Sequence, residues 1–445
     1  MRPSDRLWLA ITTLLLSGIV VALLSSCDLP LAQPTSVPGA PTNTPGPPSD
    51  PTAAPTEGAD ATPAAPSTIT LTIWTTESFS PTQAITNGQI LAQAVEDFEA
   101  GHPETRVEFI LKKPYGKGGI LDFLLTTEAV VPALLPDLVL VDVDELDAAI
   151  QAGIAQPLDD LISPDLVTDL YPFARAASTF DGQLYGLQFQ ADLDHLAYNA
   201  GQLTVPPRSW PGVLSNPEPY TFPAGGQAGL VNNDFLTQYL AVRPWPADGD
   251  PDGTFLEFDS LTAVLQYYQD GVSRGVFPTD ILNYHSTDDS WRTYLTGDAT
   301  LTHVSAHDYL ADRDQLPSTA MAPIPAINGA GAPISRGWAL ALIASDPTRQ
   351  SLAVEFMNQL MSPQTNADWN KAAGYLPTRQ AALALWDEED SYTRFTSQQL
   401  QTAQPRPRLV NYTQVAAALQ EAVEAIISGS ATPEEAAAQA IDKVQ

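Results

Sequence analysis

Two histidines and two aspartates are the residues of this chain whose spacing could support metal or acid–base chemistry. His303 and His307 have the spacing of a zinc site on a helix, but they fall in a predicted strand and loop, and no glutamate follows His303. Asp142 and Asp144 could act as the carboxylate pair of a glycosidase, although an acidic chain supplies such pairs by chance. The sequence therefore predicts no metal site and no enzyme.

Nucleotide and thiol chemistry are equally poorly supported. The segment Tyr115–Gly119 is rich in glycine, but it lacks the spacing and the final Lys-Ser/Thr of a phosphate-binding P-loop. Cys27 is the only cysteine, so the chain has neither a disulfide framework nor a thiolate metal site. No cofactor is expected.

Residues 1–26 have the pattern of a lipoprotein signal peptide. Arg2 and Arg6 provide a positive start, and residues 7–24 form an apolar run that suits a signal sequence or a short transmembrane helix. The run ends in Leu-Ser-Ser-Cys27, which resembles the bacterial lipobox, in which the cysteine is acylated and becomes the first mature residue. We expect lipidation of Cys27; the alternative is an uncleaved anchor beside a free thiol.

Residues 27–67 are interpreted as a spacer between this lipid anchor and the folded part. Beyond Cys27 they consist almost entirely of Pro, Thr, Ala, Ser and Gly, a composition that cannot bury enough apolar surface to fold and that favours extended chain. The protein is therefore expected to be extracytoplasmic and membrane-anchored, at the cell surface or in a periplasm.

The charge of the chain limits its partners. It has 52 acidic and 20 basic residues, a net charge of −32. Such a chain is not expected to bind nucleic acid or to dock electrostatically on anionic lipid. Because the acids are spread along the sequence, they are best explained as a solubility feature.

Alternating strand and helix patterns begin at residue 68. Residues 68–74, 105–110 and 136–141 have the β-branched, alternating or continuous apolar patterns of strands. Residues 89–100, 116–128 and 144–152 have helical spacing, and Gly101 and Gly153 close the first and last of these helices. This order predicts a mainly parallel α/β sheet, whose ligands lie at the carboxyl ends of the strands. Those ends are Trp74 to Glu77 and Asp142 to Asp144.

Phrases along residues 68–445 resemble the family 1 extracellular solute-binding proteins of ABC importers, the maltose-binding-protein class. They are ITLTIWTTE, PDLVLVDVDELDAAIQAGIAQPLDDLI, FDGQLYGLQFQADLDHLAYNA, YLTGDATLTHVSAHDY, RGWALALIASDPTRQSLAVEFMNQLMSPQTNADW, GYLPTR and ISGSATPEEAAAQAIDKV. Gln188 occupies a usual proline position. Two further departures stand out: residues 205–250 are rich in Pro, Gly and Trp where the family usually has a Thr-Trp-acid-Glu helix start, which only Ser209–Gly212 resembles, and His307 and Tyr309 lie where many sugar binders place a tryptophan. The order and spacing of these phrases carry the resemblance.

The resemblance implies a type II periplasmic-binding-protein-like α/β fold of two lobes, each a mainly parallel sheet flanked by helices, with a cleft between them. The N-terminal lobe would comprise residues 68–192 and 320–360, and the C-terminal lobe residues 195–318 and 362–445. Cleft closure would capture a small solute, most simply a carbohydrate, for transport. The implied partners are membrane permease subunits powered by a cytoplasmic ATPase, and a monomer is expected.

Within such a cleft, aromatic rings stack on sugar faces while polar side chains bind the hydroxyls. The candidate ligand-binding residues are Trp74, Glu77, Asp142, Asp144, Gln190, Asp192, Trp245, Trp291, His307, Tyr309, Arg336, Trp338 and Tyr375. Two alternatives stay open from sequence: a non-sugar solute such as a polyamine, compatible solute or peptide, and a surface sensor or adhesin that kept the fold without transport.

Overall fold

The computed structural model describes residues 68–246, 249 and 254–444. These described residues belong to one compact unit. The predicted signal peptide, Cys27 and the proline-rich spacer lie outside the described residues. None of the described helices is both long enough and apolar enough to cross a membrane.

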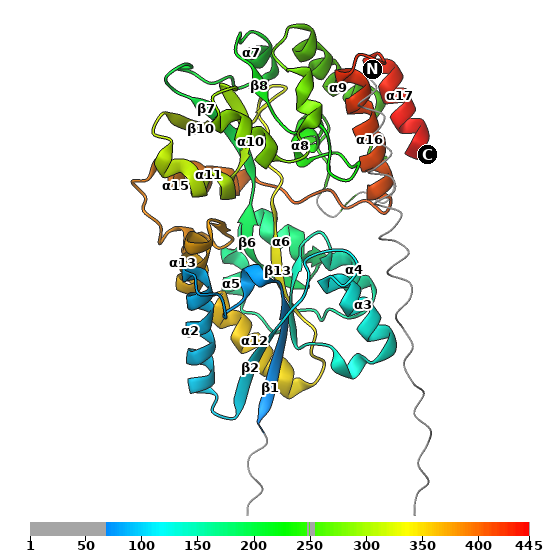
Figure 1. Cartoon of the computed structure of the whole chain (residues 1–445). Coiled ribbons are helices and arrows are strands. Elements are labelled where there is room, and N and C mark those ends of the chain that lie inside the picture. Colours follow the sequence, from blue (N-terminus) through cyan, green and yellow to red (C-terminus); the bar gives the residue numbers. More distant parts are fainter. Residues whose placement is uncertain (1–67, 247–248, 250–253, 445) are drawn as a thin grey trace, which may run out of the picture. The chain divides into compact units, whose positions relative to one another are not determined.

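A six-stranded sheet, here called the large sheet, organises the first part of the compact unit (Figure 1). Its order is β14-β6-β13-β3-β1-β2. The first strand pairs in parallel with β2 and β3, whereas β13 runs antiparallel to both β3 and β6, and β14 runs antiparallel to β6. The strands are β1 (Ile69–Thr75), β2 (Thr105–Leu111), β3 (Leu138–Asp142), β6 (Gly186–Asp192), β13 (Arg336–Leu342) and β14 (Leu376–Pro377).

Helices cover both faces of the large sheet because successive residues of a buried strand point to opposite faces. In β3, Leu138 and Leu140 pack with helices α2, α12 and α13, while Val139 and Val141 pack with α3 and α4. The helices of this part are α2 (Thr86–Gly101), α3 (Ile120–Val130), α4 (Leu146–Gln151), α5 (Pro164–Asp169), α6 (Pro172–Ser178), α12 (Pro347–Leu360) and α13 (Pro363–Ala373).

The three strands and three helices predicted up to residue 152 are present as β1, β2, β3, α2, α3 and α4, with one shift at α3. The helix predicted from Gly116 begins at Ile120. Gly116 and Gly118 have positive φ values of 70° and 78°, which are turn conformations incompatible with a helix. The four residues before Ile120 therefore form a turn.

A four-stranded sheet, here called the small sheet, organises the second part in the order β10-β7-β9-β8. The pairs β10–β7 and β7–β9 are antiparallel, and β8–β9 is parallel. The predicted α/β class is confirmed, but both sheets are mixed rather than mainly parallel, because the chain returns through antiparallel strands. The strands are β7 (Asp194–Asn199), β8 (Tyr220–Thr221), β9 (Leu301–Ser305) and β10 (Thr319–Ala322).

One large apolar core supports the small sheet. It is built mainly from α8, α9, α16 and α17, of which α9, α16 and α17 pack against one another (Figure 1). The helices not yet given bounds are α7 (Trp210–Leu214), α8 (Asn233–Val242), α9 (Phe258–Ser273), α10 (Thr287–Leu295), α11 (Ala306–Asp312), α14 (Gln380–Leu383), α15 (Ser391–Thr402), α16 (Tyr412–Ile427) and α17 (Pro433–Val444). Short pieces complete the fold: η1 (Glu77–Phe79), η2 (Pro132–Leu134), η3 (Thr279–Asn283), η4 (Arg313–Gln315), hairpin β4 (Thr179–Phe180) and β5 (Gln183–Leu184), and hairpin β11 (Pro325–Ala326) and β12 (Gly329–Ala330).

The chain passes between the two sheets later than two of the predicted boundaries. The first crossing, at Leu193 between β6 and β7, lies where the sequence placed it. Strand β10, assigned in part to the N-terminal lobe, pairs instead with β7 of the small sheet. Residues 363–377, assigned to the C-terminal lobe, form α13 and β14; α13 packs on α2, and β14 pairs with β6 of the large sheet. Backbone pairing therefore moves the second and third boundaries beyond Ala322 and Pro377.

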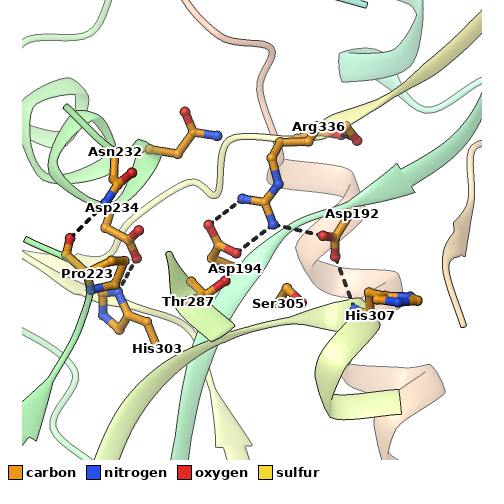
Figure 2. A network of polar contacts seen from close by, with 12 residues as sticks. Asp192, Asp194, Pro223, Asn232, Asp234, Thr287, His303, Ser305, His307 and Arg336 are labelled. Carbon is orange, nitrogen blue, oxygen red and sulfur yellow. Dashed lines mark hydrogen bonds and ion pairs between the residues drawn. The ribbon is translucent and has the colours of Figure 1, made fainter. Parts of the chain in front are cut away.

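An aspartate–histidine pair is buried beside the small sheet. Asp234 of α8 and His303 of β9 are 3% and 2% exposed and bond to each other through Nδ1 of the histidine (Figure 2). The Tyr220 hydroxyl bonds to the other ring nitrogen of His303. Burial raises the pKa of Asp234, and the adjacent histidine opposes that rise. Asp234 is thus held in the core by its partner.

Replacing His303 by leucine should lower the free energy of unfolding by about 3–5 kcal/mol, because Asp234 would lose its partner while remaining buried. Adding Asp234→Asn to that variant should recover part of the loss, since no uncompensated charge remains. Urea unfolding followed by tryptophan fluorescence measures both. Losses that simply add would show that the two side chains act independently.

Candidate ligand-binding site

A cavity of about 680 Å³ opens at the carboxyl ends of β1 and β2. Its walls come from the loop after β1, the loop after β2, the start of α3, Trp338 of β13 and Tyr375 just before β14. All these segments belong to the part of the chain built on the large sheet. A volume of this size suits a small solute.

Aromatic rings form one wall of this cavity. The Trp338 ring lies 5.8 Å from Phe79 and 5.8 Å from Tyr115, measured between centroids. Tyr375 stacks on His307 at 4.3 Å with an angle of 15° between the rings. Trp338 and Tyr375 are half-buried, so each keeps an accessible ring edge or face. Such rings can pack against the C–H face of a sugar.

Polar groups lie across from these rings. Thr76, Glu77 and Ser78 follow β1, and Lys112 and Lys113 follow β2. Hydroxyl, carboxylate and ammonium groups together can accept hydrogen bonds from a polyhydroxylated solute and donate to it. The cavity therefore combines the two kinds of contact that carbohydrate binding needs.

A cluster of three acids lies beside the aromatic wall, at the end of β3. The Tyr115 hydroxyl donates to Asp142 at 2.5 Å, and Arg406 pairs with Asp144 at 2.6 Å. Burial, together with the neighbouring Asp144, raises the pKa of Asp142 to about 6. Burial and the two nearby aspartates raise the pKa of Glu145 to about 7. Burial among like charges therefore favours the protonated form of Asp142 and of Glu145.

An arginine binds two acids at the first crossing between the sheets. Arg336 donates to Asp192 at 2.8 Å and to both carboxylate oxygens of Asp194 at 2.6 and 2.8 Å (Figure 2). Asp192 also accepts the backbone N–H of His307 at 3.1 Å. The two aspartates raise the pKa of Arg336 against the opposing effect of burial. This network joins β6, β7, α11 and β13.

Glycine is required between Arg336 and Trp338. A Cβ atom on Gly337 would lie 2.2 Å from the carbonyl oxygen of Gln190 and 2.3 Å from the side-chain nitrogen of Gln188. The side chain of Gln188, in the position the family usually gives to proline, donates to that same carbonyl at 3.1 Å. The close approach of β6 and β13 thereby fixes where Arg336 and Trp338 point.

The structure brings together several of the residues singled out from sequence. Glu77, Trp338 and Tyr375 line the cavity. Asp142, Asp144, Asp192, His307 and Arg336 lie in the adjoining networks rather than in its lining. Gln190 is 4% exposed and its side-chain oxygen has no partner among the described residues.

Four aromatic candidates are packed as core residues instead. Trp74 is 5% exposed behind Phe123, and Trp291 stacks on Tyr294 with its ring N–H bonded to Asp312. Tyr309 is buried against Tyr392, and the half-buried Trp245 packs on Phe255 against the core of the small sheet. Their positions near predicted strand ends and loops did not reveal that their rings face inward.

Sequence analysis missed several cavity residues. Phe79 and Phe123 line it from η1 and α3, and Lys112 and Lys113 line it from the loop after β2. One feature of the sequence could have indicated the two lysines. Lysine is scarce in this chain, yet three of its five lysines fall at positions 112, 113 and 117.

His303 is bonded to Asp234, whereas His307 stacks on Tyr375. No group of three or more potential metal ligands occurs among residues 68–246, 249 and 254–444. A G-x-S-x-G segment, Gly271–Gly275, occupies the C-terminal end of α9 rather than a strand-to-helix turn, so Ser273 lacks the setting of a hydrolase nucleophile.

Residues 93–395 match the family described as bacterial extracellular solute-binding protein, and the chain belongs to that family. This is a family of solute-binding proteins rather than enzymes, located outside the cytoplasm.

Curated relatives match part of the chain. It is 27% identical over 241 residues to the sn-glycerol-3-phosphate-binding periplasmic protein UgpB of Pectobacterium atrosepticum, covering 49% of this chain and 53% of that protein. It is 26% identical over 144 residues to the maltotriose-binding protein of Pyrococcus abyssi, covering 32% of this chain and 30% of the relative. The chain thus spans about half or less of the length of these relatives.

Solved structures share the fold. The maltose-binding periplasmic protein MalE of Listeria monocytogenes, in complex with maltose, superposes with a TM-score of 0.68 at 16% identity, covering 84% of this chain and 96% of that one. The sugar-binding protein MalE of Xanthomonas citri gives 0.66 at 18% identity, with the same coverage of 84% and 96%. The predicted type II periplasmic-binding-protein fold is confirmed.

The raised pKa of Glu145 predicts a pH-dependent stability. Between the ordinary value of 4.5 and about 7, the folded state holds a proton that the unfolded state has released, so Glu145 lowers stability as pH rises through this window. Glu145→Gln should therefore raise the melting temperature relative to wild type by an amount that grows from pH 5 to pH 8.

Asp160→Asn, at an exposed position, controls for the loss of one negative charge. Melting curves at half-unit pH steps measure both variants. A Glu145→Gln difference that stayed constant over this range, or that matched the control, would contradict the assignment of the raised pKa to this buried carboxyl.

Proposed function

We propose that this protein is the solute-binding component of an ABC importer, that it captures a carbohydrate or a similar polyol, and that it delivers this solute to permease subunits in the membrane. The observation that carries the proposal is the cavity at the ends of β1 and β2. It combines the half-buried rings of Trp338 and Tyr375 with Glu77, Ser78 and two lysines. The names of the relatives, which include maltotriose and glycerol-3-phosphate binders, support the same class of solute.

Capture would involve movement of two lobes, one on each sheet. The chain crosses between the sheets at Leu193, between Ala322 and Arg336, and after Pro377, and such connecting segments can act as hinges. The lobe carrying the small sheet would close over the solute held against Trp338. A single chain supplies both lobes, so we propose a monomer.

The lipid anchor completes the proposal. Acylation of Cys27, followed by a proline-rich spacer, would hold the domain at the outer side of a membrane near the permease. A single acylated cysteine followed by this spacer would leave the domain free to dock and release.

Two other solute classes fit the cavity less well. A polyamine would meet the ammonium groups of Lys112 and Lys113 and only one lining carboxylate, Glu77. A long peptide would need backbone partners from a strand edge, and the cavity is walled by loops, side chains and a helix start.

A thermal-shift screen of the full-length protein in mild detergent tests the proposal. A sugar at about one hundred times its dissociation constant should add about 2.7 kcal/mol to the stability of the folded state, which raises the melting temperature by a few degrees. Trp338→Ala should weaken binding of that sugar at least tenfold, because it removes a stacking surface.

Phe258→Ala provides the control, since it removes an exposed aromatic ring from the start of α9, outside the cavity. It should leave sugar affinity within about twofold of wild type. A solute whose binding is unaffected by Trp338→Ala would show that the cavity is not the site, and a response to polyamines alone would refute the carbohydrate assignment.

A further inference from the structure

Lysines are concentrated in the loop beside the cavity, although the chain as a whole is strongly acidic. Lys112, Lys113 and Lys117 are three of only five lysines, in a chain with a net charge of −32. The first two line the cavity and Lys117 does not. The only acid in the lining is Glu77. The cavity lining therefore has a net positive charge, opposite in sign to the protein.

Backbone hydrogen bonds hold residues 112–119, here called the lysine loop, in a defined position. The N–H of Lys112 donates to the carbonyl of Thr75 at 2.7 Å, and the N–H of Ile120 donates to the carbonyl of Lys113 at 3.0 Å. Lys113 and Gly119 also form a parallel bridge. Both ends of the turn are thus tied to neighbouring elements, so the two lysines stay at the cavity wall.

These lysines are not used in ion pairs. In the part of the chain that the structure describes, no carboxylate lies within 4 Å of the ammonium groups at positions 112, 113 and 117. Three arginines around the large sheet, by contrast, form ion pairs: Arg336 with Asp192 and Asp194, Arg349 with Asp137, and Arg379 with Asp169. The ammonium of Lys112 lies 4.0 Å from the centroid of Phe123 and 4.6 Å from that of Trp74. Aromatic faces orient a cation without neutralising it.

We propose that the solute bound here carries an anionic group, a carboxylate or a phosphate, which Lys112 and Lys113 bind while its sugar-like body packs against Trp338. This inference rests on the proposed function and names the chemical class of its solute. Charge-assisted hydrogen bonds from two ammonium groups discriminate strongly for an anion. In a protein with 52 acids, neutral sugars could be bound by carboxylates alone, so an uncompensated pair of lysines is best explained by a negative ligand.

The test compares neutral sugars with their anionic counterparts on full-length protein. Glucose and galactose are matched with glucuronate, galacturonate and glucose 6-phosphate, and dissociation constants are measured by titration calorimetry at fixed ionic strength. At least one anionic member should bind ten or more times more tightly than its neutral parent. The uronates and the phosphate distinguish the two kinds of anion.

Charge-removing variants locate the effect. Lys113→Gln and Lys112→Gln should each weaken binding of the anionic sugar about tenfold and weaken binding of its neutral parent by a clearly smaller factor, because glutamine still donates hydrogen bonds but carries no charge. Lys117→Gln makes the same change of charge in the same loop but outside the lining, and it should alter either affinity by less than twofold. Melting temperatures of the unliganded variants verify that each has folded.

The outcomes separate the two proposals. Equal affinity for neutral and anionic sugars, or equal effects of all three lysine variants, would overturn the anionic assignment and leave carbohydrate binding intact. Binding of neither set would overturn both. Tighter binding of an anionic sugar that Lys113→Gln abolishes and Lys117→Gln preserves would establish it.

Discussion

The ion-pair network of Arg336 is the contact on which the arrangement of this protein most depends. Its guanidinium binds Asp192 at the end of β6 and Asp194 at the start of β7, on either side of the residue where the chain leaves the large sheet for the small one. A bidentate pair of this kind fixes direction as well as distance. Trp338 lies two residues along the same strand, so the network that joins the sheets also sets the position of the main aromatic ring of the cavity.

In this acidic chain, several aspartates each have a basic side chain as a direct partner. Asp192, Asp194, Asp137 and Asp169 each have an arginine, and the buried Asp234 has His303. The acids at the end of β3 are only partly compensated, by Arg406 and the Tyr115 hydroxyl, which is why burial and mutual repulsion raise two of their pKa values. The lysine loop is the reverse case, because its ammonium groups form no ion pair with a carboxylate among the residues that the structure describes.

The first three strands and the helices that follow them could be read from sequence because each rests on local periodicity, whereas the family was indicated by the order and spacing of phrases that resemble it. Residues 138–142 are apolar throughout and are buried on both faces, and Arg336–Gly337–Trp338 does begin a strand. The cavity was harder to predict, because orientation depends on packing between distant segments. Trp74 and Trp338 both belong to strands, yet one faces the core beneath α3 and the other the cavity. Phe79 reaches the cavity from η1, a three-residue element too short to show a periodic pattern, and Phe123 reaches it from the first turn of α3, whose start lay four residues beyond the predicted one.

All residues that line the cavity come from the part of the chain built on the large sheet. A solute can therefore meet every one of these groups without any rearrangement of the rest of the molecule. In kinetic terms, the encounter rate would depend on this single preformed wall, while the residence time would depend on how long the small-sheet part stays closed over it. Substitutions on the two parts should accordingly act on different rate constants of the same equilibrium.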